Sequence, residues 1–492
     1  MEQVDEERGP RIGILVVAYN AASTLARVLD RIPADFRPRI SDVLICDNNS
    51  EDSTYLVGLG YRHKDPDLPI TVVRNPRNVG YGGNQKVGYR WAIEHGLDIV
   101  VLLHADGQYA PEFLPQIVAP LERGEADAVF GSRMMQPGGA RAGGMPLYKF
   151  VGNKVLTAFE NSLVGLELSE WHSGYRAYRV DALRDIPFEA NTDEYHFDTH
   201  IIVQLHEAGK RIVELPIPTY YGDEVSYVNG IKYARDIVGD ILRYRLHKMG
   251  LGSGEAAFAS AAYDLKTGPS TSHGRILAWL RGLPPCRVLV LGPSAAELGA
   301  RVRDLGHEVT GAGPDAPAKD ALDHFVEADL DAGLPADLGG PFEVVALVEV
   351  LEQVREPERL LGDVRTVLAP GGTVVTAVSN FGHWYPRARV AAGLFDYDRR
   401  GILDRNNVRF FTRRTFERLA HRTGFAVLRR ESLGPPIEVL ARGLPGETER
   451  PPGRGVRAVH AVDSLGVVVR PTLFAYQFVY ELRPADPATA DG

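Results

Sequence analysis

Residues 99–112, IVVLLHADGQYAPE, set the architecture of the first half of this chain. The five apolar residues at 99–103 predict a buried strand, and the polar residues after them predict a turn at its carboxyl end. Other apolar segments alternate with helix-like stretches on either side, at residues 13–18, 42–46, 70–73 and 128–131. This alternation favours an α/β fold, in which helices cover both faces of a mainly parallel sheet.

The 492-residue chain is too long for a single compact core, so more than one domain is expected. Residues 249–254 have the Gly-rich composition of a linker. A second α/β series follows, with apolar segments at residues 287–291, 308–311, 343–347 and 373–377. We therefore predict a disordered tail over 1–10, a first α/β domain over 11–248, a linker over 249–285, a second α/β domain over 286–482 and a disordered tail over 483–492.

Charge and composition exclude several classes of protein. The formal net charge of −9 argues against a nucleic-acid-binding protein. Cys46 and Cys286 lie in different halves, so they build no disulfide framework, and we interpret both as buried inert thiols. No apolar run is long enough to span a bilayer, and the acidic N-terminus is not a secretory signal. We expect a cytoplasmic protein. The basic segment 243–248 would allow peripheral contact with the inner membrane surface, although a solvated helix end explains it too.

Polar residues follow the first two predicted strands. The first strand ends in Ala18, Tyr19 and Asn20, and the second ends in Asp47, which precedes a helix-capping segment at 50–54. In open α/β sheets, nucleotides bind at the carboxyl ends of the strands. Asp47 could there accept hydrogen bonds from a base or a ribose, although a simple strand-to-helix turn would also explain it.

The fourth predicted strand is followed by His104, Ala105, Asp106 and Gln108. In extended backbone, His104, Asp106 and Gln108 would share one face. An imidazole, a carboxylate and an amide oxygen could then hold Mg²⁺ or Mn²⁺ together with a diphosphate. A polar turn after a buried strand is the alternative, but the order of these segments along the chain favours a site.

Taken in order, these segments resemble the family-2 glycosyltransferases of GT-A fold, near the polyprenyl-phosphate mannosyl- and glucosyltransferases. The matching stretches are residues 17–20, 47–54, 78–84, 104–108, 131–133 and 173–178. The resemblance implies an inverting enzyme that uses a nucleotide-diphosphate sugar. It places Asp47 at the nucleotide, and it matches His104-Ala105-Asp106 to the metal-binding Asp-X-Asp motif, with Asp106 as a catalytic residue. The further donor contacts implied are Ala18, Tyr19, Asn20, Gly83 and Ala105.

The acceptor is less defined, and the sequence leaves an envelope component, a polyprenyl phosphate or a natural product open. His104 replaces the usual first aspartate, which would change metal preference. Asp223 and Glu224 stand where the resemblance implies a basic lipid-phosphate loop, and they would repel a phosphate. A phosphate acceptor would need no strong base, whereas a hydroxyl acceptor would.

Three charged residues are candidates for the acceptor or phosphate side of the reaction. We favour Glu170 over the nearby His172 as a base for a hydroxyl acceptor, although a surface carboxylate at a helix start explains Glu170 equally well. Arg133 and Arg176 could clamp phosphate oxygens bidentately, or they could form structural ion pairs.

From residue 286 the chain resembles class I S-adenosylmethionine-dependent methyltransferases, which implies a Rossmann-like domain. Stretches 288–292, 305–311, 325–330, 342–345, 349–354, 368–372 and 401–412 carry the resemblance. Gly292 begins the cofactor loop, and Asp329 matches an adenine-contacting acid. The ribose-binding acid expected after the second strand falls at Gly313, with Asp315 two residues further on.

Other expected cofactor contacts are also changed. Val290 stands for the acid before the glycine loop, Ser294 and Ala296 replace two of its glycines, and Gln353 and Asn407 stand where histidines are common. These losses argue for a weakened or absent cofactor site. Three hypotheses remain: a glycosyltransferase with an inactive methyltransferase-like appendage, a bifunctional enzyme, and a non-catalytic nucleotide-sugar-binding protein. Asp47 and Asp106 argue against the last.

Overall fold

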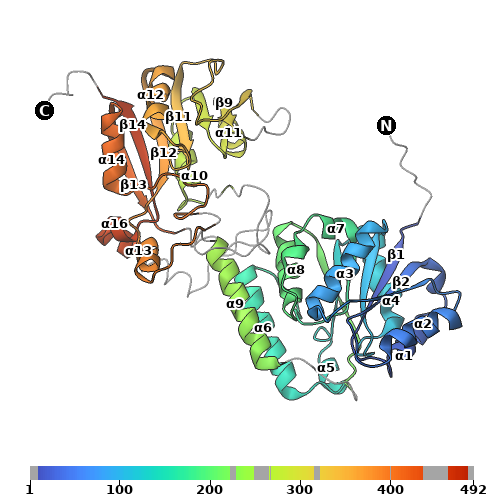
Figure 1. Ribbon diagram of the computed structural model, residues 1–492. Helices are drawn as coiled ribbons and strands as arrows, with labels where there is room; N and C mark the ends of the chain where they lie inside the picture. The colour runs from blue at the N-terminus through green and yellow to red at the C-terminus, as the bar shows by residue number, and fades with distance from the viewer. Residues whose placement is uncertain are drawn as a thin grey trace. The chain divides into compact units, whose positions relative to one another are not determined.

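The computed structural model describes residues 9–221, 229–248, 265, 268–314, 322–398, 401–435 and 464–485. The chain separates into two compact units that divide near the end of helix α9 (Gly230–Lys248), and each is described by itself (Figure 1). Among the helices within these residues, none is long and apolar enough to cross a membrane.

The described residues of the first unit form a seven-stranded sheet in the order β3-β2-β1-β4-β6-β5-β7. Strand β6 runs antiparallel to both of its neighbours, and the other pairs are parallel. The strands are β1 (Ile12–Ala18), β2 (Ile40–Asp47), β3 (Ile70–Arg74), β4 (Ile99–His104), β5 (Ala128–Ser132), β6 (Arg176–Arg179) and β7 (Ile212–Pro216). The helices before α9 are α1 (Leu25–Asp30), α2 (Thr54–Lys64), α3 (Gly80–Glu94), α4 (Leu114–Glu122), α5 (Gly139–Ala142), α6 (Leu147–Val164), α7 (Val180–Arg184) and α8 (Phe197–Glu207).

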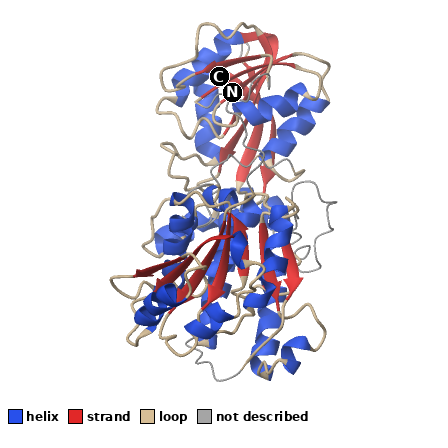
Figure 2. Ribbon diagram, turned by 90° about the vertical axis from the view of Figure 1, so that its right-hand side faces the viewer, coloured by secondary structure: helices blue, strands red, loops and turns tan. Residues whose placement is uncertain are grey.

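The central strands of this sheet are buried on both faces. In β1, Leu15 and Val17 belong to one hydrophobic cluster, whereas Ile14 and Val16 belong to the other. Successive side chains of a strand point to opposite faces, so a strand covered on both sides is apolar throughout. Helices accordingly lie on both faces of the sheet (Figure 2).

The second unit has its own seven-stranded sheet within the described residues, in the order β10-β9-β8-β11-β12-β14-β13. Strand β14 is antiparallel to β12 and β13, and the remaining pairs are parallel. The strands are β8 (Arg287–Leu291), β9 (Glu308–Gly313), β10 (His324–Glu327), β11 (Phe342–Val348), β12 (Leu368–Ser379), β13 (Phe425–Leu433) and β14 (Gln477–Pro484). The helices are α10 (Ser272–Arg281), α11 (Ala295–Arg303), α12 (Pro357–Val367), α13 (Trp384–Ala391), α14 (Arg413–Arg422) and α16 (Pro471–Phe474).

The predicted fold class is confirmed, with one α/β domain following another, but two predicted boundaries are wrong. Helix α10 lies inside the expected linker, and its Ile276, Leu277 and Leu280 belong to the core of the second unit. Strand β14 continues to Pro484, into the expected C-terminal tail. The expected tails at 1–8 and 486–492, and the expected linker over 249–264, lie outside the described residues.

Candidate active site

The candidate active site of the first unit lies at the carboxyl ends of three adjacent parallel strands. Ala18 at the end of β1 pairs in register with Asp47 at the end of β2. On the other side, Val17 pairs with His104 at the end of β4. Because these strands are neighbours in the sheet, the residues predicted to bind the donor and the metal are brought to one edge.

Asp47 is fully buried at this edge. Its Oδ1 accepts hydrogen bonds from the backbone N–H of Ser50, at 3.3 Å, and from the Ser50 hydroxyl. Its Oδ2 lies 3.3 Å from Nε of Arg74, at the end of β3. In this structure the carboxylate therefore orders the loop that follows β2, and it presents no exposed oxygen to a nucleotide.

The loop after β1 is tied to the loop after β2. Asn20 has φ of 50°, in the left-handed region that asparagine tolerates better than most residues. Its backbone N–H donates to Oγ of Ser50 at 2.9 Å, and its Oδ1 accepts from the N–H of Glu51 at 2.9 Å. Tyr19 and Asn20 are both partly exposed, so they present polar groups at the edge where a donor is expected.

The stretch 78–84 connects β2 to α3 through an amide network. Asn48 donates to Oδ1 of Asn78 at 2.9 Å, and Asn84 donates to the carbonyl of Cys46 at 3.0 Å. Gly83, a predicted donor contact, is buried, and its N–H already donates to Asp193 at 3.3 Å. Asn78 and Asn84 of this stretch therefore hold the end of β2 and the start of α3 together.

The Cys46 thiol belongs to the same network and behaves as the sequence predicts. It is buried and donates to Oδ1 of Asn84 at 2.9 Å. Burial, together with the charge of the adjacent Asp47, raises the pKa of Cys46 to about 12, so the thiol is not a nucleophile.

The expectation that His104, Asp106 and Gln108 share one face is wrong, because β4 ends at His104 and the chain then turns. Gly107, with φ of 78°, supplies the left-handed residue that this turn needs. Oδ1 of Asp106 accepts from the N–H of Gln108 at 2.9 Å. Ala105 is buried and bonded to β1, whereas Asp106 is exposed. Asp106 is therefore the group of this motif that offers a carboxylate to solvent.

The imidazole of His104 is held by residues that sequence reasoning did not assign to the site. Its ring packs edge-on against Tyr81 and Tyr109, with centroid distances of 5.6 and 5.0 Å, and Nε2 lies 3.3 Å from the Tyr81 hydroxyl. A Cβ on Gly174 would lie only 2.6 Å from this ring. Burial lowers the pKa of His104 despite the charge of Asp106, so the ring is neutral and chemically able to bind a metal.

Asp198 of α8 belongs to this group too, because it contacts the same Tyr81 hydroxyl as His104 does. Its Oδ2 accepts from the Tyr81 hydroxyl at 3.2 Å, and its Oδ1 accepts from Gln85 at 3.3 Å. Tyr81 and Gly174 lie in stretches that carry the family resemblance, 78–84 and 173–178, so the sequence contained a signal for both. Asp198 lies in no motif, and only the fold brings it to this place.

Arg133 and Glu170, predicted as a phosphate clamp and a base, are paired with each other instead. Nε of Arg133 donates to Oε1 of Glu170 at 3.0 Å, its backbone N–H donates to Oε2 at 2.7 Å, and Asn153 donates to Oε1 at 2.8 Å. Burial alone would raise the pKa of Glu170, but the Arg133 guanidinium outweighs burial and lowers it. A buried carboxylate that is paired with a guanidinium and has a lowered pKa is a poor base, so the structure corrects both expectations.

Arg176 also has a structural role. It is buried, and its guanidinium donates to the carbonyls of Ser173 at 2.7 Å, Trp171 at 2.7 Å and Asp198 at 3.2 Å. These bonds occupy the donors that a phosphate would need, so Arg176 is not a phosphate clamp here. His172, the other candidate base, is buried with Nε2 3.2 Å from Glu160 and Nδ1 3.0 Å from the Tyr233 hydroxyl.

In the second unit, Gly292 and Asp329 line one cleft at the carboxyl ends of β8 and β10, as the sequence predicts. The cleft has a volume of about 630 Å³, within the range of small-molecule pockets. Gly292 adopts φ of 105°, which a residue with a side chain would resist. The position, the size and this open glycine turn fit the nucleoside cofactor that the resemblance implies. Gln353 also lines the cleft, and Asp315 lies outside the described residues.

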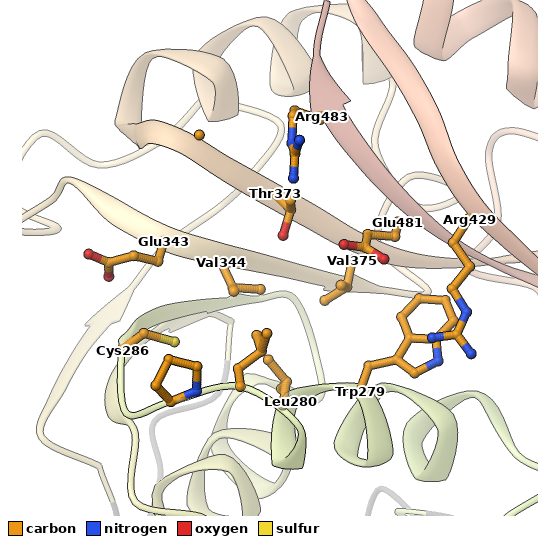
Figure 3. Close-up of a pocket in the computed structure, with 13 residues that line it drawn as sticks. Trp279, Leu280, Cys286, Glu343, Val344, Thr373, Val375, Arg429, Glu481 and Arg483 are labelled. Carbon is orange, nitrogen blue, oxygen red and sulfur yellow. The ribbon is translucent and has the colours of Figure 1, made fainter.

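A second hollow of this unit, of about 390 Å³, lies between α10 and the strands β11 and β12 (Figure 3). It is lined by Cys286, which directly precedes β8, by Glu343 of β11 and by Trp279 of α10. The guanidinium carbon of Arg429 lies 4.6 Å from the centroid of the Trp279 ring. Cys286 is only partly buried, so the expectation of a buried thiol is wrong for this residue, although partial burial still raises its pKa.

Comparison with known proteins agrees with this geometry. Residues 13–187 match the family model described as glycosyl transferase family 2. An undecaprenyl-phosphate mannosyltransferase of Micrococcus luteus is 34% identical over 208 residues, which cover 42% of this chain and 82% of that protein. The chain belongs to glycosyltransferase family 2. A polyprenol monophosphomannose synthase of Mycolicibacterium smegmatis is 27% identical over 42% of this chain and 75% of that protein.

The second unit of this family-2 glycosyltransferase also has a match, since residues 270–430 correspond to a model described as a methyltransferase domain. Among solved structures, glucosyl-3-phosphoglycerate synthase from Mycobacterium tuberculosis, in complex with Mn²⁺ and UDP-glucose, aligns with 19% identity and a TM-score of 0.36. The alignment covers 48% of this chain and 79% of that one.

Proposed function

We propose that the family-2 domain is a metal-dependent, inverting hexosyltransferase that moves a sugar from a nucleotide diphosphate to a polyprenyl phosphate at a membrane surface. The observation that carries the metal-dependent transfer is the exposed carboxylate of Asp106, on the sheet edge that also carries Asp47. The lipid acceptor is supported by the 34% identity with an undecaprenyl-phosphate mannosyltransferase over most of that protein.

Asp106 fits a divalent cation because only one of its oxygens has a hydrogen bond within the described residues, the bond from Gln108. The neutral ring of His104, fixed between two tyrosines, is the second candidate ligand. When bound, the cation would neutralise the charge that develops on the departing diphosphate. The residues of the chain would orient this ion and, through the ordered loops after β1 and β2, the donor.

The buried state of Glu170 agrees with a phosphate acceptor. A phosphate oxygen is already nucleophilic, so transfer to it needs no strong base. In this structure Glu170 is fully buried and bonded to Arg133 and Asn153, which makes it a poor base for a hydroxyl acceptor. Asp223 and Glu224, which the sequence analysis expects to repel a phosphate acceptor, lie outside the described residues.

Helix α6 supplies a surface suited to a lipid-embedded acceptor. Leu147, Val151 and Val155 recur every four residues on one side of the helix, with exposed fractions of 61%, 50% and 62%. Tyr148 beside them is 73% exposed. The acidic residue of this helix, Glu160, is fully buried, so its exposed side is apolar and basic. Such a surface binds the interface of an anionic bilayer.

Transfer of radiolabelled sugar to polyprenyl phosphate in anionic vesicles tests the proposal. We expect Asp106→Asn to lower turnover by about 100-fold or more. EDTA should lower the turnover of the wild type by a similar factor, and added Mn²⁺ should restore it. We expect the double variant Val151→Asp, Val155→Asp to lose vesicle binding and lipid glycosylation, while donor binding is kept. Leu56→Asp, at an equally exposed apolar position on α2, is the matched control. Full transfer by Asp106→Asn would refute the metal role, and equal vesicle binding by all variants would refute the docking surface.

A further inference from the structure

The cleft of the second unit lies where an open α/β sheet binds ligands. Strand order reverses between β8 and β11, and such a switch point leaves a crevice at the carboxyl ends of the strands. The cleft is lined there by Gly292 after β8, Pro314 after β9, Asp329 after β10 and Val350 after β11. Its place in the fold therefore does not depend on which side chains the cofactor loop carries.

The position expected to bind ribose cannot carry a carboxylate in this fold. A Cβ on Gly313 would lie 2.3 Å from the carbonyl oxygen of Gly292 and 3.6 Å from Cβ of Ala295. The carbonyl belongs to the backbone turn that begins the cofactor loop, and Gly292 itself donates to Ala312 at 2.9 Å. Glycine at 313 is therefore required by this close approach of two strand ends.

Glu327 supplies a carboxylate beside this empty position. It is the register partner of Gly313 on the neighbouring parallel strand, and residues paired in register point to the same face of a sheet. The two positions lie about 4.8 Å apart, the spacing of adjacent strands. Glu327 is exposed and lines the cleft, and the described residues give its carboxylate neither a hydrogen bond nor an ion pair. Its additional methylene relative to aspartate extends its reach.

The charge of the cleft indicates the kind of nucleoside that it accepts. Glu327, Asp329 and Asp331 line it, and none of the lining residues that the structure describes is basic. Oδ2 of Asp331 lies 3.7 Å from Nε of Arg355, so this carboxylate is paired with a guanidinium, whereas Glu327 and Asp329 have no ion pair within the described residues. A phosphate-bearing dinucleotide would be repelled here, whereas a cationic nucleoside such as S-adenosylmethionine would be attracted.

We propose that the second unit binds S-adenosylmethionine and that Glu327, instead of a residue at the end of β9, holds the two ribose hydroxyls. The diol-binding carboxylate has moved one strand outward, because residue 313 must be glycine. This inference concerns a site separate from the glycosyltransferase site and does not rest on the function proposed for it.

Calorimetric titration of the full chain with S-adenosylhomocysteine and with its 3′-deoxyribose analogue tests the assignment. A hydrogen bond from a ribose hydroxyl to a carboxylate should make the wild type prefer the ribose form by about 10- to 100-fold. Glu327→Gln should bind the ribose form more weakly and lose most of this preference. Glu308→Gln, which removes a carboxylate from the opposite end of β9, should behave as the wild type does.

Three results would overturn the assignment. The wild type could bind neither compound at millimolar concentration, which would make the unit an inactive appendage. Glu327→Gln could keep the full preference for the ribose form while its melting temperature stays at the wild-type value. Asp315→Asn could lose the preference instead, which would place the diol-binding acid in the segment after β9.

Discussion

Glu170→Gln exchanges one oxygen for an NH₂ group inside the buried Arg133–Glu170 ion pair, and it separates a structural role from a catalytic one. Oε1 accepts from two guanidinium nitrogens of Arg133, Nε and Nη2, and from Asn153, and Oε2 accepts from the Arg133 backbone N–H. Whichever way the glutamine amide is turned, its NH₂ group faces an N–H donor. The variant therefore leaves a buried donor unsatisfied and the Arg133 charge uncompensated.

The expected cost follows from burial. Removing one partner of a buried ion pair destabilises a protein by about 3–5 kcal/mol, since the remaining charge stays desolvated. For a unit of this size, each kcal/mol lowers the melting temperature by roughly 2–4 °C, so we expect a fall of roughly 10 °C. Because Glu170 is assigned no proton transfer, the variant that remains folded should retain turnover within a few-fold of wild type at low temperature.

A second arginine–glutamate pair in the same unit provides the matched control. Arg90 also donates to a glutamate, Glu189, through Nε and Nη2, at 3.0 Å to Oε1 and 3.1 Å to Oε2, but both side chains are about half exposed. Glu189→Gln should cost less than about 1 kcal/mol, because exposed ion pairs contribute little. Calorimetry measures both changes, and hydrogen exchange assigns the lost stability to the first unit.

The reasoning would be refuted by one combination of results. If Glu170→Gln melts within about 2 °C of wild type while its turnover falls by orders of magnitude, the carboxylate acts in the reaction. A pH–rate profile that loses its acidic limb in this variant would identify the carboxylate as a base. A hydroxyl acceptor would then replace the phosphate acceptor proposed here.

Three further predictions concern single positions. Burial raises the pKa of Glu352 to about 8, so wild-type stability should fall as pH rises above about 4.5, when the unfolded glutamate ionises, and level off above about 8. Glu352→Gln should remove this fall and be more stable by roughly 3 kcal/mol at pH 7, measured by chemical denaturation across pH. Gly313→Asp restores the acid implied by the methyltransferase resemblance. We expect this variant to destabilise the second unit and to weaken S-adenosylhomocysteine binding, because the new Cβ would collide with the carbonyl oxygen of Gly292. A gain in affinity, measured by calorimetric titration, would contradict this expectation. Gly174→Ala should displace the His104 ring, lower the melting temperature by a few degrees because the added methyl overpacks a buried place, and lower metal-dependent turnover of the folded variant by about 10-fold or more. Unchanged Mn²⁺ dependence would show that the position of this ring is unimportant.

Local patterns in the sequence predicted the architecture well, because they report local physics. Apolar runs bounded by polar turns correspond to β1, β2 and β4, since strands buried on both faces are apolar throughout. Parallel neighbours end at one edge of a sheet, so the meeting of Asp47 and His104 followed from the order of the segments. The sequence does not predict helix α10, because the helix is short and follows a Gly-rich segment that has the composition of a linker.

Side-chain partners could not be predicted, because they depend on contacts distant in sequence. Arg133 pairs with Glu170, which lies 37 residues further along the chain. An arginine that binds a phosphate cannot be distinguished in the sequence from an arginine that pairs with a buried carboxylate. Helix α6 shows the same limit. Leu147, Val151 and Val155 have the spacing that usually marks a buried helix face, yet here that face is exposed.

Both units depart from their family motifs at an acidic position, and in both the structure shows a packing reason for the residue found there. His104 stands for an aspartate, and its ring fills the space between Tyr81, Tyr109 and the bare Cα of Gly174. Gly313 stands for a ribose-binding acid, and it alone allows the carbonyl of Gly292 to approach. A position that had only lost its function would accept many side chains, whereas each of these is closely fitted to its neighbours. Packing therefore accounts for both substitutions, and the metal site and the cofactor site proposed here are each built around a residue that its neighbours require.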